Sequence, residues 1–256
     1  MKLKMKKLNT QQWFLPLLLI CVLIVGGCAS NTPSAEIQNN NPAGDQTVTP
    51  ISQNPTQPMT NLPQLNGKAT VVMTVNGSPI TIEIDGINAP VTAGNFVDLV
   101  NKGVYDGLAF HRVVREPDPF VVQGGDPQSK DPKFPSARLG TGGFIDPATS
   151  KERMIPLEIK PKGAEQPIYS KTLESARITA EPVLSHRRGA VAMARSQFPD
   201  SASSQFYFSL AELPFLDGSY AVFGNVTDGM NIVDQIKQGD RIDSAKVTQG
   251  LENLKN

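Results

Sequence analysis

A two-residue alternation across residues 69–85 limits what this chain can fold into more than any other feature. The run ATVVMTV at 69–75 is apolar and β-branched, and in PITIEID at 79–85 three isoleucines alternate with Thr81, Glu83 and Asp85. Asn76-Gly77, between the two runs, offers residues that accept positive φ. Successive side chains of a strand point to opposite faces, so this pattern predicts a β-hairpin with one buried face.

Further short apolar runs bounded by turn residues predict more strands. They lie at 109–114, 120–123, 154–159, 190–194, 205–210, 221–226 and 242–249. Two segments instead have apolar residues at helical spacing: 90–102, which ends at Gly103, and 228–238. Many strands with two helices predict a mainly β fold, a closed or sandwiched sheet with helices at its ends. The segment 127–186 is irregular, and either a functional loop or local disorder would explain it.

The first 27 residues have the order of a secretory signal: a basic start, an apolar stretch of 13 residues at 13–25, and small residues at the end. A membrane-spanning helix needs about 20 apolar residues, so this stretch favours a signal peptide over a permanent anchor. The run LIVGGC at 23–28 resembles the lipobox of bacterial lipoproteins. That resemblance implies lipidation of Cys28, a bacterial cell envelope location, and a domain tethered to the membrane on its extracytoplasmic side. An ordinary signal peptide with Cys28 near the cleavage point is the alternative.

Residues 28–66 contain six prolines and no aromatic residue. Such a composition cannot bury enough apolar surface to offset the entropy of ordering the chain. It predicts a disordered tether between Cys28 and one folded domain at 67–256. A proline-rich docking ligand is disfavoured because no PxxP run has basic flanks.

Charge and cysteine content exclude several classes of function. Lys+Arg and Asp+Glu both total 24, but four lysines lie in the predicted signal peptide, which leaves 20 basic against 24 acidic residues. Nucleic acid binding needs a basic surface, so no nucleic acid partner is expected. The two cysteines are Cys21 and Cys28, which leaves the domain no thiol for a disulfide or a metal. His111 and His186 cannot make a metal site alone, so neither a metal nor a cofactor is predicted.

Patterns for covalent and phosphate chemistry are weak. Ser136, Ser185 and Ser209 have no GxSxG-like setting for a nucleophile. Gly140-Thr141-Gly142-Gly143 lacks the Lys-Ser/Thr that follows in a phosphate-binding loop. We interpret it as a flexible surface loop.

Five short blocks occur in a fixed order. They are FHR at 110–112, FVVQGGD at 120–126, MAR at 193–195, SQFY at 204–207, and FLDG at 215–218 with VFG at 222–224. Together they resemble the cyclophilins, a family of peptidyl-prolyl cis-trans isomerases, over nearly all of 69–249. The resemblance implies an eight-stranded antiparallel β-barrel closed by two α-helices. It also implies an enzyme that accelerates rotation about Xaa-Pro bonds and assists protein folding. Its partners would be proline-containing peptides and unfolded or partly folded proteins, and we expect a monomer.

The resemblance also assigns site residues. Arg112 matches the family's catalytic arginine. The substrate-binding positions fall on Phe120, Val121, Gln123, Ala194, Arg195, Gln205, Tyr207, Phe215, Leu216 and Tyr220. Five of them depart from common family residues: Val121 for Met, Arg195 for Asn, Tyr207 for Phe, Phe215 for Trp and Tyr220 for His. These changes leave cyclosporin sensitivity open, and two extra residues between Arg112 and Phe120 leave that loop's geometry open.

The reaction accounts for an arginine without a nucleophile. Rotation about a peptide bond meets a barrier of about 18–20 kcal/mol from amide resonance, and no bond is broken. A guanidinium that donates to the prolyl nitrogen binds the twisted transition state better than the planar ground state, which is the condition for catalysis. No proton is transferred, so His111 is expected to be structural or to hydrogen-bond beside the site. His186 is expected on the surface.

Two other functions compete with the enzyme. A non-catalytic peptide-binding scaffold on the same barrel is kept open by Tyr207, Arg195 and the lengthened loop after Arg112. A solute-binding lipoprotein is disfavoured because the domain lacks two alternating α/β halves. Isomerisation of a short Xaa-Pro peptide discriminates between the enzyme and the scaffold.

Overall fold

The computed structural model describes residues 61–255 of the chain. The predicted signal peptide, Cys28 and most of the predicted tether lie outside these residues. Within 61–255, no helix has the length and apolarity needed to cross a membrane.

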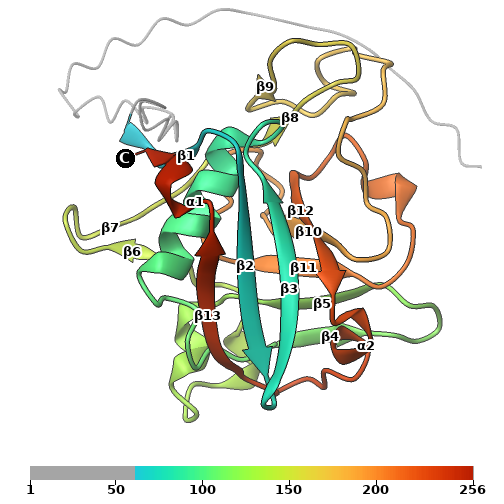
Figure 1. Ribbon diagram of the computed structural model, residues 1–256. Helices are drawn as coiled ribbons and strands as arrows, with labels where there is room; N and C mark the ends of the chain where they lie inside the picture. The colour runs from blue at the N-terminus through green and yellow to red at the C-terminus, as the bar shows by residue number, and fades with distance from the viewer. Residues whose placement is uncertain (1–60, 256) are drawn as a thin grey trace, which may run out of the picture. The chain divides into compact units, whose positions relative to one another are not determined.

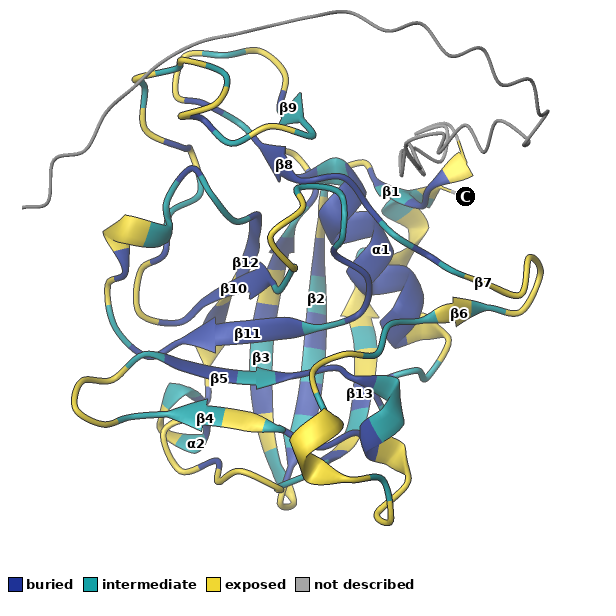
Figure 2. Ribbon diagram, turned by 180° about the vertical axis from the view of Figure 1, so that it is seen from behind, coloured by how far each residue is buried: buried dark blue, intermediate teal, exposed yellow. Residues whose placement is uncertain are grey.

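Eight strands form one antiparallel sheet in the order β13-β2-β3-β12-β10-β11-β5-β4. Their bounds are β2 Lys68–Val75, β3 Ser78–Asp85, β4 Arg112–Val114, β5 Val121–Gly124, β10 Ala190–Met193, β11 Phe206–Ser209, β12 Val222–Asp228 and β13 Ile242–Gln249. In Figure 1, β2, β3 and β13 run across the direction of β4, β5 and β11, and Figure 2 shows the same crossing from behind. The sheet therefore curls around its buried face.

The two edges of the curled sheet meet just before β4 and β13 begin. The backbone N–H of Gly107 donates to the Ile242 carbonyl (2.7 Å), and the N–H of Ile242 donates to the Leu108 carbonyl (2.9 Å). The N–H of Phe110 donates to the Asp240 carbonyl (2.8 Å). The predicted mainly β, eight-stranded antiparallel barrel is confirmed.

The hairpin predicted from the alternation is β2–β3. Asn76 (φ 51°) and Gly77 (φ 75°) both have positive φ, the requirement of a tight two-residue hairpin turn. Alternate residues from Ala69 to Val75 are buried, and Ile80, Ile82 and Ile84 are fully buried. These side chains form one wall of the barrel interior.

Helix α1 (Pro90–Asn101) packs against the barrel and is buried along most of its length (Figure 2). Phe96 lies with its ring centroid 5.4 Å from that of Phe206 in β11 and 5.0 Å from that of Phe223 in β12. The Glu158 carboxylate accepts from the N–H groups of Val91 (3.1 Å) and Thr92 (2.7 Å), groups that a helix start leaves unpaired. The predicted helix at 90–102 is confirmed to within one residue.

The second predicted helix, 228–238, is wrong in length, because α2 covers only Met230–Val233. Strand β12 continues to Asp228, and Gly229 (φ 87°) turns the chain into the helix. Arg115 then donates to the carbonyls of Val233 (3.1 Å) and Asp234 (2.9 Å), where the helix ends. The apolar spacing that predicted a long helix reflects burial of one turn and of the loop after it.

The predicted strand at 154–159 does not join the barrel. Only β8 (Glu158–Ile159) forms there, paired with β9 (Ile168–Tyr169). Leu157 and Ile159 are buried in a small separate cluster with Leu173. The irregular segment around it holds the two-stranded sheet of β6 (Ile145–Asp146) with β7 (Lys151–Glu152), and the 3₁₀ helices η2 (Pro127–Lys130) and η3 (Ser136–Arg138).

The folded part begins before the predicted boundary at Gly67. Strand β1 (Gln64–Leu65) pairs with β14 (Leu254–Lys255), which follows the 3₁₀ helix η5 (Leu251–Asn253). Leu62 and Leu65 belong to the main hydrophobic core. The last residues assigned to the tether are therefore part of the domain.

Candidate active site

One row of side chains lies on the outer face of neighbouring barrel strands. Arg112 of β4 pairs with Gln123 of β5, and Gln123 pairs with Tyr207 of β11. The adjacent residues Val122 and Phe206 are buried in the main core. Because the side chains of a strand alternate, the same pattern that fills the barrel places this row outside it.

This row forms part of a small apolar pocket of about 200 Å³. Its lining residues are Arg112, Phe120, Val121, Gln123, Ala194, Arg195, Tyr207, Leu216 and Tyr220. All nine are among the residues predicted for the site. Gln205 and Phe215, also predicted, lie beside this pocket but do not line it.

Arg112 is exposed at the pocket and is oriented by two neighbours. Its Nη1 donates to Gln123 Oε1 at 3.3 Å, and its guanidinium carbon lies 5.4 Å from the centroid of the Phe120 ring. Phe120 is stacked in turn on Phe215, with centroids 6.0 Å apart and rings 20° from parallel. Phe215 is 69% exposed, so it covers the outer side of Phe120.

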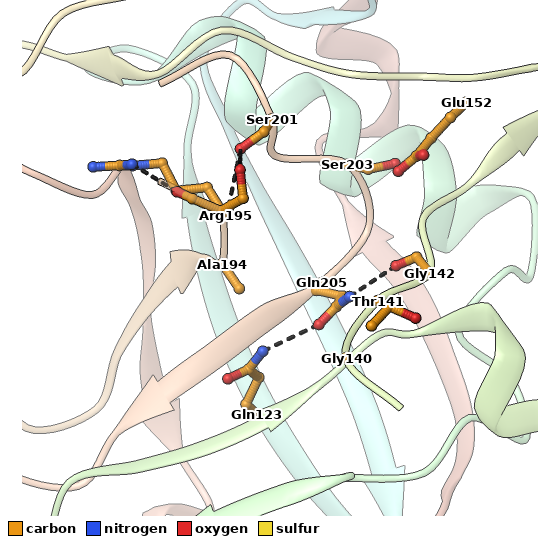
Figure 3. Close-up of a pocket in the computed structure, with 11 residues that line it drawn as sticks. Gln123, Gly140, Thr141, Gly142, Glu152, Ala194, Arg195, Ser201, Ser203 and Gln205 are labelled. Carbon is orange, nitrogen blue, oxygen red and sulfur yellow. Dashed lines mark hydrogen bonds between the residues drawn. The ribbon is translucent and has the colours of Figure 1, made fainter. Parts of the chain in front are cut away.

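A second, more polar pocket of about 320 Å³ adjoins the first (Figure 3). It shares Gln123, Ala194 and Arg195 with the apolar pocket, and its other lining residues are Gly140, Thr141, Gly142, Glu152, Ser196, Ser201, Ser203 and Gln205. Burial, and then the Asp126 carboxylate, raise the pKa of Glu152.

Gln205 connects the two pockets, as Figure 3 shows. Its Oε1 accepts from Gln123 Nε2 at 3.1 Å, and its Nε2 donates to the Gly142 carbonyl at 2.8 Å. Together with the Arg112–Gln123 contact, these bonds form a continuous chain from the guanidinium to the Gly142 backbone. The predicted site residues Arg112, Gln123 and Gln205 are thus brought together.

Gly140, Thr141 and Gly142, in the segment interpreted as a flexible surface loop, line the polar pocket. The buried Asp126 carboxylate accepts from the N–H groups of Gly140 (2.6 Å), Gly142 (3.3 Å) and Gln128 (2.9 Å). A Cβ at position 142 would lie 2.4 Å from Asp126 Oδ1, so any other residue there would force the Asp126 side chain to move. In the sequence, only Asp126 at the end of the QGGD block could have indicated this contact, and nothing there links it to the glycines at 140 and 142.

Arg195 joins two segments of the wall. Its Nε and Nη2 donate to the Ser219 carbonyl (3.0 and 2.7 Å), and its Nη1 donates to the Ser196 carbonyl (2.8 Å). Its guanidinium carbon also lies 4.7 Å from the centroid of the Tyr220 ring. Among the described residues the Arg195 guanidinium thus makes three hydrogen bonds within the protein, whereas the Arg112 guanidinium makes one.

The expectation that His186 lies on the surface is wrong, because it is only 2% exposed. Its Nδ1 lies 2.7 Å from Asp217 Oδ1 and its Nε2 lies 2.9 Å from the Tyr207 hydroxyl. Burial lowers its pKa against the opposing effect of Asp217. The charged residues Arg187 and Arg188 next to it had suggested a surface position, but both point outward while the imidazole is enclosed.

His111 lies beside the site, and burial lowers its pKa as well. Within 61–255 neither of its buried ring nitrogens has a hydrogen-bond partner. In the same part of the chain, His, Cys, Asp and Glu side chains form no group of three that could hold a metal ion.

The family model described as cyclophilin type peptidyl-prolyl cis-trans isomerase/CLD matches residues 70–253. The chain belongs to the cyclophilin family. Its match spans every strand of the barrel except the first two residues of β2, so this cyclophilin domain is the unit described above.

Several named relatives have the same family activity in their names. A Synechocystis protein named for the thylakoid lumen is 46% identical over 207 residues, covering 77% of this chain and 51% of the relative. A chloroplastic peptidyl-prolyl cis-trans isomerase of Arabidopsis thaliana is 44% identical over 214 residues, covering 77% and 46%. Peptidyl-prolyl cis-trans isomerase A of Dickeya dadantii is 34% identical over 173 residues, covering 66% and 70%. The chain spans about half the length of the first two relatives.

Solved structures support the fold. A crystal structure of a Cryptosporidium parvum cyclophilin type peptidyl-prolyl cis-trans isomerase has a TM-score of 0.52 at 23% identity, covering 71% of this chain and 98% of that one. A second structure of that protein, in the presence of the dipeptide Ala-Pro, has a TM-score of 0.51 at 24% identity, covering 70% and 99%.

Proposed function

We propose that this cyclophilin catalyses cis-trans isomerisation of Xaa-Pro bonds in polypeptides, with Arg112 as the catalytic residue. The observation that carries the proposal is an exposed guanidinium beside an apolar pocket on the outer face of the barrel. Among the described residues Arg112 donates only to Gln123, so donors are left for a substrate.

The pocket suits a prolyl ring and its neighbouring backbone. Phe120, Val121, Tyr207 and Leu216 supply an apolar surface for the ring. Gln123 and Ala194 lie where the pocket meets the polar pocket, so a peptide chain can continue from one into the other. Holding the chain on both sides of one amide lets binding energy act on the twist of that bond alone.

Arg112 contributes to the rate through its charge. As the amide twists, the prolyl nitrogen regains a lone pair, and a guanidinium N–H can donate to it. A charged hydrogen bond contributes about 1.5–3 kcal/mol, which corresponds to roughly one to two orders of magnitude in rate. The fixed fork of donors matters, because a lysine ammonium lacks that planar geometry.

The test is isomerisation of an Ala-Pro peptide by the full chain, kept soluble in mild detergent. Arg112→Ala should lower kcat/KM by at least about tenfold, and Arg112→Lys should recover little of it. Arg138→Ala is the matched control, because Arg138 also lies over a phenylalanine ring, 5.3 Å from the Phe134 centroid, and lines neither pocket. A folded wild-type chain that binds the peptide without accelerating it would favour the non-catalytic scaffold instead.

We further propose that the chain acts at the bacterial cell envelope, anchored through lipidated Cys28, where it assists protein folding. The lipobox-like run before Cys28 supports this location. A single acyl chain binds a membrane only marginally, so a durable anchor needs more than one chain on the cysteine.

Expression in a bacterium tests the anchor. Cys28→Ser should abolish incorporation of labelled fatty acid and move the protein out of the membrane fraction. Cys21→Ser, the matched control in the apolar stretch, should change neither. Persistence of Cys28→Ser in the membrane fraction without label would show that something other than a lipid holds the chain there.

A further inference from the structure

Behind the apolar pocket lies a chain of hydrogen bonds that the proposed reaction does not use. His186 Nδ1 is 2.7 Å from Asp217 Oδ1, and His186 Nε2 is 2.9 Å from the Tyr207 hydroxyl. The rings of His186 and Tyr207 are stacked 12° from parallel, with centroids 6.0 Å apart. His186 is 2% exposed and Tyr207 is 5% exposed, so the bond between them is shielded from water, whereas the Asp217 side chain is 21% exposed.

The protonation states of this chain follow from burial. Burial raises the pKa of Tyr207, so its hydroxyl keeps its proton and can donate. Burial also lowers the pKa of His186, so the ring is neutral and carries one N–H. With Nε2 accepting from Tyr207, that N–H is on Nδ1 and donates to Asp217.

His186 contacts both sides of the pocket. Tyr207 lies on β11, and its ring forms the pocket floor. Asp217 directly follows the 3₁₀ helix η4 (Pro214–Leu216), which carries the lining residue Leu216 and, beside the pocket, Phe215. The backbone of His186 adds two bonds to the same segment. Its N–H donates to Asp217 Oδ1 (2.8 Å), and its carbonyl accepts from the Leu213 N–H (2.8 Å).

We infer that His186 is a positioning residue, which holds the Tyr207 floor and the η4 wall of the apolar pocket at one fixed spacing. The inference rests on the proposed function, since it concerns the pocket that would receive proline. It also explains Tyr207: a phenylalanine would fill the same space, but it could not reach His186. Because His186 is behind the pocket and does not touch Arg112, its loss should weaken peptide binding more than it slows the bound peptide.

The test separates KM from kcat for an Ala-Pro peptide in the full chain. His186→Leu should raise KM at least about fivefold, with a change in kcat of less than about twofold. His186→Gln should restore most of the binding, because one amide can accept from Tyr207 and donate to Asp217. Tyr207→Phe combined with His186→Leu should be no worse than His186→Leu alone, because the two residues act as one unit.

Tyr169→Phe is the matched control. Its hydroxyl also pairs with a buried acid, Glu158, but it lines neither pocket, so its KM should equal that of the wild type. An unchanged KM in folded His186→Leu would overturn the inference. So would a fivefold rise in KM that Tyr169→Phe reproduces.

Two readouts do not depend on turnover. The ring ¹⁵N resonances of His186 should show a proton on Nδ1, and Tyr207→Phe should shift the Nε2 resonance without unfolding the chain. A proton on Nε2 would contradict the inference. Peptide affinity can also be measured directly by titration. If the wild type binds but does not isomerise, and His186→Leu weakens binding fivefold, then the positioning role stands and the proposed activity fails.

Discussion

The two sides of the apolar pocket are built in different ways. On one side, Arg112, Gln123 and Tyr207 are placed by strand register, each directly opposite the next across the sheet. On the other side, Leu216 is placed by a loop that Asp217 ties to His186, 31 residues earlier in the chain. The strand side follows from local alternation, whereas the loop side depends on bonds between residues distant in sequence. The position of the strand-side residues should therefore depend on packing in the core beneath them. The position of the loop-side residue should depend on a few polar groups.

The largest expected effect comes from breaking the strand side through the core beneath it. Phe206 is fully buried next to Tyr207 in β11, and its ring packs against those of Phe96, Tyr105 and Phe208. Phe206→Ala should lower the free energy of unfolding by about 3–5 kcal/mol. Chemical denaturation measures this, with the 61% exposed Phe198 as control, where Ala should cost less than about 0.5 kcal/mol. Equal losses at the two positions would contradict the assignment of Phe206 to the core.

A smaller loss is expected from removing one polar group that organises a loop. Asp126→Ala takes away the acceptor of the Gly140 and Gly142 N–H groups and should cost about 1.5–3 kcal/mol of unfolding free energy. Hydrogen exchange should speed up at those two amides and stay slow in β5. Asp131→Ala is the control, because that exposed carboxylate accepts only from the nearby Lys133 N–H at 2.8 Å among the described residues. Unchanged exchange at Gly140 would show that other contacts hold this loop.

The smallest effect is a pH dependence that sharpens the role of His186. Burial lowers the pKa of both His111 and His186 below the 6.5 of an exposed histidine, despite Asp126 and Asp217. The folded chain then binds protons less readily than the unfolded chain. The two histidines should therefore contribute fully to the free energy of unfolding above about pH 6.5. Below that pH their contribution should fall, by at most about 1.36 kcal/mol per pH unit for each histidine.

The difference between the wild type and His186→Gln isolates this contribution. Other groups cancel in the difference, including Glu158, whose pKa burial raises. Denaturation curves between pH 7.5 and pH 5 should show a shallower loss in the variant. Parallel curves for the two proteins would mean that His186 titrates in the folded chain as it does in the unfolded one.

The barrel could be predicted where one residue type repeats with strand period. Ile80, Ile82 and Ile84 are buried as the alternation requires, and Asn76-Gly77 forms the turn that those residues favour. The helix at 228–238 could not be predicted correctly, because the burial of Ile236 comes from a loop and its spacing imitates a helix.

Eleven site residues were predicted from motifs, and nine of them line the apolar pocket. The other two are Gln205 and Phe215. The polar pocket was not predicted, since Glu152 and Ser203 reach it from separate segments without a shared motif. His186 was misplaced for a similar reason. Its local sequence is charged, and only Tyr207 and Asp217, distant in sequence, explain its burial.

The central claim is that Arg112 stabilises the transition state of rotation rather than the bound peptide. Exchange NMR on an Ala-Pro peptide with the full chain measures both the affinity and the cis-trans rate of the bound peptide. For Arg112→Ala we predict a bound rate at least about tenfold lower, with an affinity within about threefold of the wild type. A rate that is unchanged, or an affinity that falls as much as the rate, would contradict the account.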